Sequence, residues 1–290
     1  MAVFPSSSAD LEVFRVTDTT RTIDGGSGSD ILDAGDLQLR WQSLWNTPES
    51  SGATFQAIDP ITGRSWSLDV RNIEAVVGSP HSDKICANAQ MTSLLGEGGD
   101  DVLVAAMDSP LPTFMRGGEG ADSIAGGEVF DDINGNQGDD TLNGFEDGDW
   151  VAGGQGDDFL FGDSGRDVVY GNLGDDTCEG GADGDIVRGG QGNDSVVGGG
   201  GDDWLAGDRG SDTIAGGAGA DVFNSFAGAG LDLITDFNGA EGDRVALWVG
   251  ASFSVRQLGL DTIVDLGGGD LVVLVGQQLS SFNEGWIVTN

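Results

Sequence analysis

Basic residues are scarce in this chain of 290 residues, which has 12 lysines and arginines against 49 acidic residues. The resulting net charge of −37 excludes binding to nucleic acid or to anionic membranes by charge attraction. The only lysine is Lys84 and the only histidine is His81. His81 falls at a glycine position of a degenerate repeat, so we interpret it as a substituted turn residue rather than a catalytic base.

Cysteine is rarer still, and two cysteines are too few for a disulfide framework. Cys178 falls at an inward-facing repeat position and Cys86 lies in a distant block, so we expect two free thiols. Met1 to Phe14 lacks a continuous apolar core, and no hydrophobic run approaches the length of a membrane span. We therefore expect neither a cleavable N-terminal signal nor a transmembrane helix.

Motifs of hydrolytic enzymes are also missing: the chain has no H-E-x-x-H and no G-x-S-x-G. Its carboxylates recur at one repeat position, which gives paired-carboxylate hydrolysis no specific support. We expect no enzymatic activity. The alternative is a small carbohydrate-active or hydrolytic enzyme with its site in residues 34–77.

Glycine is abundant, with 52 residues, and in residues 117–224 it follows a strict period of nine. Twelve consecutive blocks, the first of which starts at residue 117, follow the pattern G-G-x-G-x-D-x-U-x, in which U is apolar. The sixth position is always aspartate: Asp122, Asp131, Asp140, Asp149, Asp158, Asp167, Asp176, Asp185, Asp194, Asp203, Asp212 and Asp221. The eighth is always apolar: Ile124, Ile133, Leu142, Val151, Leu160, Val169, Cys178, Val187, Val196, Leu205, Ile214 and Phe223.

This period predicts a coiled stack of short strands and tight turns. Positions seven to nine suffice for a strand whose middle side chain points inward. The six preceding residues are rich in glycine, which tolerates positive φ and lets the chain turn back. Two nonapeptides make one coil, so equivalent residues 18 apart stack at about the 4.8 Å spacing of paired strands. The alternative is a solvated, acidic, glycine-rich linker.

Stacking places aspartates of successive coils one strand spacing apart, and this repulsion needs a counter-charge. Each contact between like charges at about 5 Å costs on the order of 3 kcal/mol at an effective dielectric constant of 20. The blocks contain only three basic residues, Arg166, Arg188 and Arg209. A hard divalent cation between the turns would remove the repulsion, and oxygen-only ligands suit Ca²⁺.

These nonapeptides resemble those of RTX proteins, whose parallel β-helix binds calcium. The resemblance implies an all-β fold, a right-handed parallel β-roll with an antiparallel β cap at its C-terminal end. It also implies that carbonyls from positions two and four of one turn, and one and three of the next coil, join both aspartates. One site would then combine Gly154, Gly156 and Asp158 with Gly171, Leu173 and Asp176. The other main-chain positions assigned to the sites are Gly135, Gly138, Gly153, Gly174, Gly189, Gly190, Gly192, Gly207 and Gly210. Up to ten ions fit between the coils.

The segments before residue 117 vary the same pattern. Residues 1–24 alternate weakly and predict capping strands, and residues 25–77 hold one isolated nonapeptide followed by an insertion. The insertion contains Trp41, Trp45 and Trp66, and we expect it to form β-hairpins that fold onto the roll. Residues 78–116 are degenerate repeats in which Asp83 and Asp101 could hold one more ion. Residues 105–116 carry two prolines and predict a block with a bulge or a loop.

Residues 225–290 lose the glycine period and resemble the segment that closes the roll in secreted proteases of the serralysin type. We expect antiparallel strands that cap the open end, because an unprotected stack of strands would aggregate. The resemblance makes Asp236 and Asp243 candidates for a further ion, with a purely structural turn as the alternative. The tail, residues 282–290, resembles the uncleaved signal read by type I secretion machinery, although a capping strand would look similar.

The two outer faces of the predicted roll differ. Position seven runs through small polar residues on one face, interrupted by Phe159. On the other face it forms an apolar ladder of Trp150, Val168, Ile186, Trp204 and Val222, with Tyr170 at position nine. Such a patch is typical of a surface that something covers. The candidates are a segment of the chain itself, a second copy, or a protein or polysaccharide partner. The polar ladder is also compatible with ice binding, which we regard as the weaker interpretation.

Taken together, the sequence predicts a secreted calcium-binding protein that leaves the cytoplasm unfolded and folds outside, where calcium is abundant. We expect a structural, surface, matrix or adhesion role, with calcium ions and the type I secretion machinery as partners.

Overall fold

The structure is a computed structural model that describes residues 2–3, 12–16, 22–24, 30–35, 37–47, 50–58, 60–61, 64–71, 73–282 and 284–289. The chain forms two compact units, Met1–Glu146 and Asp147–Asn290. Apart from one short 3-10 helix, η1 (Leu279–Ser281), all regular elements of the described residues are strands. The all-β prediction is confirmed. None of the helical structure in the described ranges is long and apolar enough to cross a membrane.

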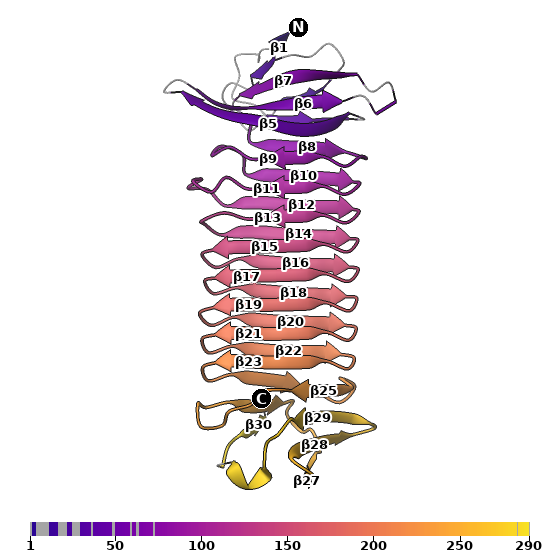
Figure 1. The fold of residues 1–290 in the computed structure, drawn as a ribbon, viewed down its shortest axis with the longest axis vertical. Helices are drawn as coiled ribbons and strands as arrows, with labels where there is room; N and C mark the ends of the chain where they lie inside the picture. Colours follow the sequence, from indigo (N-terminus) through magenta and orange to yellow (C-terminus); the bar gives the residue numbers. More distant parts are fainter. Residues whose placement is uncertain are drawn as a thin grey trace. The chain divides into compact units, whose positions relative to one another are not determined.

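Unit 2 is a parallel β-solenoid built from two sheets that alternate along the chain (Figure 1). Sheet B contains β16 (Trp150–Gln155), β18 (Val168–Leu173), β20 (Ile186–Gln191), β22 (Trp204–Arg209), β24 (Val222–Ser225), β26 (Arg244–Leu247) and β30 (Ile287–Thr289). Sheet A contains β17 (Phe159–Ser164), β19 (Thr177–Ala182), β21 (Ser195–Gly200), β23 (Thr213–Ala218), β25 (Leu231–Ile234) and β29 (Asp270–Leu274), followed outward by β28 (Asp261–Gly267) and β27 (Ser254–Leu258).

Register in the regular coils of unit 2 is fixed at 18 residues, as predicted. Cys178 pairs with Val196, and Val196 with Ile214. The strands are longer than predicted, however. β19 covers positions seven to nine of one block and positions one to three of the next. β19 continues beyond position nine, where Gly181, the glycine at position two, adopts φ 120° and pairs with Gly199. The turn proper is therefore only about half a block.

Unit 1 uses the same two-sheet stack in its second half. Its strands are β1 (Ala2–Val3), β2 (Glu12–Arg15), β3 (Thr22–Asp24), β4 (Asp30–Asp33), β5 (Gln38–Thr47), β6 (Ser50–Ile58), β7 (Ser65–Arg71), β8 (Ala75–Ser79), β9 (Lys84–Cys86), β10 (Ser93–Gly98), β11 (Val102–Val104), β12 (Thr113–Glu119), β13 (Ser123–Ala125), β14 (Asp131–Gln137) and β15 (Thr141–Glu146). β8, β10, β12 and β14 pair in parallel in one sheet, and β9, β11, β13 and β15 pair in parallel in the other.

The predicted insertion of unit 1 forms a long antiparallel hairpin, β5–β6, and β6 also pairs antiparallel with β7. One bridge between Arg40 and Lys84 joins β5 to the roll strand β9. Leu39 N also donates to Asp83 Oδ1. The hairpins therefore continue the stack. Residues 25–29 of the isolated nonapeptide, and the side chains of Trp41, Trp45 and Trp66, lie outside the described residues.

A thin apolar core runs inside each stack. Every position-eight side chain of residues 117–224 is at most 2% exposed, which confirms the predicted inward ladder. Cys178 is one of them and is a free thiol, and Cys86 is also free. At the end of unit 2, Phe237 contacts Phe223, Phe282 and Trp286. These aromatic rings cover the last apolar layer of the core.

The predicted antiparallel cap is present at the C-terminal end, but the segment before it continues the parallel coil. β25 and β26 pair in parallel with β23 and β24, so they extend the solenoid. Only β27, β28 and β29 form antiparallel pairs, and β29 is also parallel to β25. The coil survives the loss of the glycine period because Asp232 and Asp243 keep the place of a sixth position. The apolar residues Ile234 and Val245 keep that of an eighth.

Candidate metal sites along the turns

The aspartates at position six lie in columns at the point where each turn enters a strand. All twelve are between 0% and 3% exposed. In unit 2 one column holds Asp149, Asp167, Asp185, Asp203, Asp221 and Asp243, and the other holds Asp158, Asp176, Asp194, Asp212 and Asp232. In unit 1 the column runs through Asp83, Asp101, Asp122 and Asp140, and Asp131 lies on the other edge.

One oxygen of each carboxylate has a defined partner. Asp176 Oδ1 accepts a hydrogen bond from Asp158 N at 2.8 Å, and Asp194 Oδ1 accepts one from Asp176 N at 2.9 Å. The predicted pair Asp83 and Asp101 is joined in the same way, at 2.7 Å. A loop is present at residues 105–112, whereas residues 113–116 belong to β12. Asp122 Oδ1 accepts from Asp101 N across this loop, at 2.8 Å. The carboxylates thus hold successive coils in register.

The second oxygen is different. In Asp101, Asp122, Asp167, Asp176, Asp185, Asp194, Asp203, Asp212 and Asp221, Oδ2 is buried and has no hydrogen-bond partner. Burying a carboxylate oxygen without a partner costs free energy, because the oxygen loses its hydrogen bonds to water and gains none in the protein. A hard cation would supply the missing partner of these oxygens. Such oxygens occur in both units.

The glycines at position one leave space for a cation beside the Oδ2 atoms of the columns. A Cβ added to Gly153 would lie 2.1 Å from Asp158 Oδ2 and 2.9 Å from Gly171 O. At Gly189 it would lie 2.2 Å from Asp194 Oδ2. Real Cβ atoms do not approach other atoms this closely. Each predicted site therefore has a cradle that only glycine leaves open, where a carboxylate oxygen and a carbonyl of the next coil converge.

The glycines of position four bring the turns themselves together. A Cβ on Gly174 would lie 1.8 Å from Gly156 O, and Gly174 has φ 134°. The predicted ligand carbonyl of Gly156 therefore faces the next turn. The carbonyl of Leu173, also a predicted ligand, accepts a hydrogen bond from Gly156 N at 2.9 Å. A carbonyl has two lone pairs, so this bond still leaves one for a cation.

The two candidate carboxylates at the end of the roll, Asp236 and Asp243, lie in different environments. Asp243 stands in its column, with Oδ1 accepting from Asp221 N at 3.1 Å. Asp236 is exposed, and its two oxygens accept from Gly216 N and Gly217 N, each at 2.9 Å. Asp232 was missed because it follows Asp212 by 20 residues rather than 18. Its signal was present, since Asp232 is followed two residues later by the apolar Ile234.

No group of three or more His, Cys, Asp and Glu side chains suited to a metal occurs among the described residues. That agrees with a site built from two carboxylates and several main-chain carbonyls, because such a site contains only two of these side chains. Each predicted site supplies only oxygen, the donor that Ca²⁺ prefers over softer ligands.

A family model described as the RTX calcium-binding nonapeptide repeat matches residues 22–36, 116–144, 143–178, 179–214 and 197–234. The chain carries RTX calcium-binding repeats. These matches include the blocks whose carboxylates form the columns. RTX repeats of this type bind calcium, so the cation expected in the turns of this chain is Ca²⁺.

Solved structures similar to the chain include two from bacterial enzymes. A subunit of the mannuronan C5-epimerase from Azotobacter vinelandii is 27% identical, with a TM-score of 0.32 over 39% of this chain and 77% of that one. The extracellular lipase LipA from Serratia marcescens is 18% identical, with a TM-score of 0.35 over 69% of this chain and 45% of the lipase. The chain thus spans less than half of the lipase. No curated protein matches it.

Without a cation, the RTX turns resist ionisation. Burial raises the pKa of Asp176 to about 6 and the pKa values of Asp185 and Asp194 to about 7. Neighbouring carboxylates contribute to these raised pKa values, but less than burial does. Between about pH 4 and 7 the folded, calcium-free roll therefore binds more protons than the unfolded chain. Its free energy of unfolding must then decrease as the pH rises through that window.

Calcium has to displace those protons, so we expect its apparent affinity to fall in mild acid. The calcium concentration at half-maximal folding should rise by roughly tenfold between pH 7.5 and pH 5.5. Calcium titrations followed by circular dichroism at the two pH values measure this directly. An equal or lower midpoint at pH 5.5 would show that the turn carboxylates are ionised without the metal.

The outer side of sheet B in unit 2 carries the predicted apolar ladder. Trp150, Val168, Ile186, Trp204 and Val222 stand opposite one another on β16, β18, β20, β22 and β24. Trp150 is 48% exposed and Ile186 40%, so no described segment buries them. We call this ladder, together with Tyr170 and Arg188 beside it, the aromatic face.

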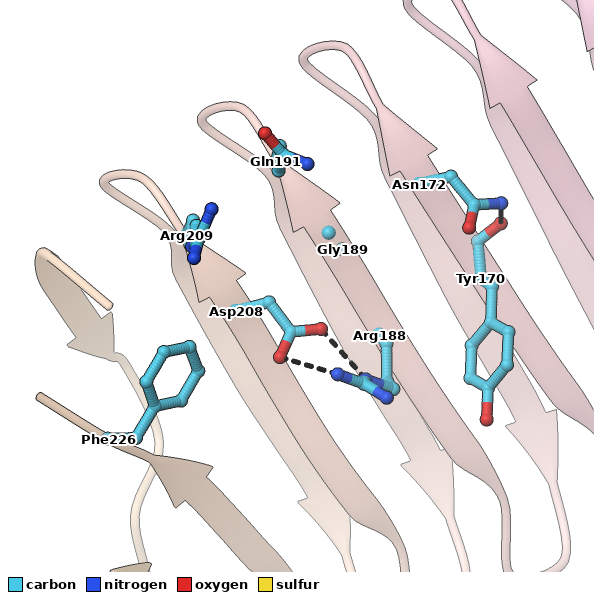
Figure 2. Close-up of a pocket in the computed structure, with 9 residues that line it drawn as sticks. Tyr170, Asn172, Arg188, Gly189, Gln191, Asp208, Arg209 and Phe226 are labelled. Carbon is cyan, nitrogen blue, oxygen red and sulfur yellow. Dashed lines mark hydrogen bonds and ion pairs between the residues drawn. The ribbon is translucent and has the colours of Figure 1, made fainter. Parts of the chain in front are cut away.

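Arg188 lies at the centre of the aromatic face. Its guanidinium is 5.6 Å from the Tyr170 ring and 5.9 Å from the Trp204 ring, and Trp150 meets Tyr170 edge-on at 6.2 Å. Arg188 also makes two 2.8 Å bonds to Asp208. A hollow of about 370 Å³ adjoins this group (Figure 2). Its lining consists of Tyr170, Asn172, Arg188, Gly189, Gly190, Gln191, Asp208, Arg209 and Phe226.

Proposed function

We propose that this chain is a secreted protein whose RTX roll folds when calcium binds outside the cell, and that the folded roll is a structural or adhesive component of a cell surface or matrix. The observation that carries the calcium-dependent part is the row of buried Oδ2 atoms without partners. In each site the two position-six carboxylates and the carbonyls of the adjoining turns are the proposed ligands. Bound calcium would neutralise the carboxylates and link one coil to the next.

Export in the unfolded state follows from the same chemistry. A chain with a net charge of −37 and unfilled turns has little to hold it compact where free calcium is low. We propose that it leaves by type I secretion, with residues 282–290 as the signal. The folded tail also serves as a capping strand, since β30 pairs with β26. The two roles are compatible, because the signal would be read before the cap forms.

The aromatic face is the proposed contact with the matrix, and a polysaccharide is the occupant that its chemistry favours. The side chains of Asn172, Gln191 and Asp208 offer planar donors and acceptors, which suit neighbouring hydroxyl groups. Arg188 is paired with Asp208, so the pair as a whole carries no net charge that would select an anion. Exposed aromatic rings beside these groups provide apolar surface for a sugar ring.

Replacing both Trp150 and Trp204 with serine should weaken polysaccharide binding by about tenfold or more, because both substitutions remove aromatic surface. The calcium-loaded intact chain would be tested by affinity electrophoresis against a neutral β-glucan and a polyuronate. Phe159→Ser is the matched control, since Phe159 is 52% exposed on sheet A. Equal retention of all variants would contradict the polysaccharide contact. Loss of self-association in the double variant alone would instead assign the face to a second copy.

The competing function is an enzyme with its site in residues 34–77. If the proposed function is correct, the intact chain incubated with these polysaccharides will release no new reducing ends, whether calcium or chelator is present. Turnover at a rate above that of the heat-denatured chain would overturn the non-enzymatic role.

A further inference from the structure

The last coil of unit 2 places two buried carboxylates, Asp212 and Asp232, against each other. β23 and β25 pair in parallel with Thr213 opposite Leu233, so the aspartates that precede these residues are neighbours. Asp212 is 0% exposed and Asp232 is 2% exposed. Their carboxyl groups lie within hydrogen-bonding reach of each other. A strict count of nine residues does not mark Asp232 as a ligand, although the family match over residues 197–234 includes it.

Hydrogen bonding at Asp232 departs from that of every regular coil. Elsewhere in the column, the backbone N–H of one aspartate donates to Oδ1 of the next, as Asp194 N does to Asp212 Oδ1 at 2.9 Å. Asp212 N instead donates to Leu231 O, at 3.1 Å. Asp232 Oδ1 is consequently buried with no hydrogen-bond partner, and so is Asp212 Oδ2.

The other oxygen of Asp232 is held in place. Ser225 Oγ donates to Asp232 Oδ2 at 3.1 Å, and Ser225 is itself only 5% exposed. A hydroxyl that donates to a carboxylate favours its ionised form. The serine therefore fixes Oδ2 of Asp232 and leaves Oδ1, which is buried and has no hydrogen-bond partner, available to a cation.

Two buried carboxylates in contact require either a shared proton or a cation between them. We propose that Asp212 and Asp232 bind one further divalent cation, Ca²⁺ in the calcium-loaded protein, with Ser225 as the residue that positions Asp232. This site rests on the proposed uptake of calcium by the roll. Its own basis is the pair of orphaned oxygens and the serine. It extends the metal column one coil beyond the last nonapeptide and links β25 to the repeats.

The test counts ions bound to the intact chain. Wild type and Asp232→Asn are saturated with calcium, freed of loose ions by gel filtration and analysed for calcium by mass spectrometry. The variant should retain one ion fewer per chain. Glu179→Gln is the control, because Glu179 is exposed at the outward-facing ninth position on β19, which supplies no proposed ligand. It makes the same change of charge and should retain the wild-type number.

Ser225→Ala keeps both carboxylates. It therefore tests the site in a variant that is expected to fold even if Asp232→Asn does not. It should lower the affinity for the most weakly held ion by about fivefold while circular dichroism stays unchanged. Equal ion counts in wild type and Asp232→Asn would show that the pair shares a proton, and would overturn this site alone. A wild-type chain that retains no calcium would instead overturn the proposed function.

Discussion

Replacing Gly171 with alanine is expected to lower the free energy of unfolding of the calcium-loaded chain by about 3 kcal/mol. The added Cβ would lie 2.3 Å from Asp176 Oδ2 and 2.4 Å from Gly189 O. Gly189 O belongs to the backbone of the next coil, so it cannot rotate away. The methyl group would also occupy the cradle where that carboxylate oxygen is available to a cation. Steric overlap and weakened calcium binding therefore act in the same direction.

Gly200→Ala is the matched control for this prediction. Gly200 has no atom within 4 Å of an added Cβ, and it pairs with Ala182 and Ala218 in the neighbouring strands. Alanine at Gly200 should therefore leave the folded state unstrained and stabilise the chain by about 0.4–1 kcal/mol, because it restricts the unfolded chain. Urea unfolding in saturating calcium measures both variants. Similar midpoints for the two would contradict a specific role for glycine at position one.

Removal of calcium is expected to have the largest effect of all, the loss of most of the β-structure of residues 117–224. Three contacts between ionised aspartates of one column cost about 9 kcal/mol at an effective dielectric constant of 20. A typical domain is stable by only about 5–15 kcal/mol. Each column of unit 2 has more than three such contacts, and the basic residues near the roll are few. Arg188 is already paired with Asp208.

The sequence was most informative where one physical requirement acts on one repeat position. Position eight must fill a narrow core, and its residues are all apolar and buried. Position six must cap the neighbouring coil with a carboxylate, and its aspartates form the predicted columns. Position seven faces outward, so the aromatic face could be predicted from the alternation of side chains alone.

Strand length and the C-terminal coils were harder to predict, because there the backbone matters more than the side chains. Gly181 can belong to a turn or to a ladder, and only the pairing with Gly199 decides which. Asp232 sits two residues later than the period requires, because Gly228 and Gly230, both with positive φ, enlarge the preceding turn. A strict count of nine missed it. The side chain of Asp236 binds two backbone N–H groups, a role that no spacing could indicate.

Far-ultraviolet circular dichroism of the purified intact chain at pH 7.5, first in chelator and then with stepwise addition of calcium, tests the central claim most directly. We predict a largely unordered spectrum in chelator and a cooperative gain of β-structure as calcium is added, with magnesium much less effective. A chain that is equally compact and β-rich in chelator would show that the buried carboxylates do not need the metal.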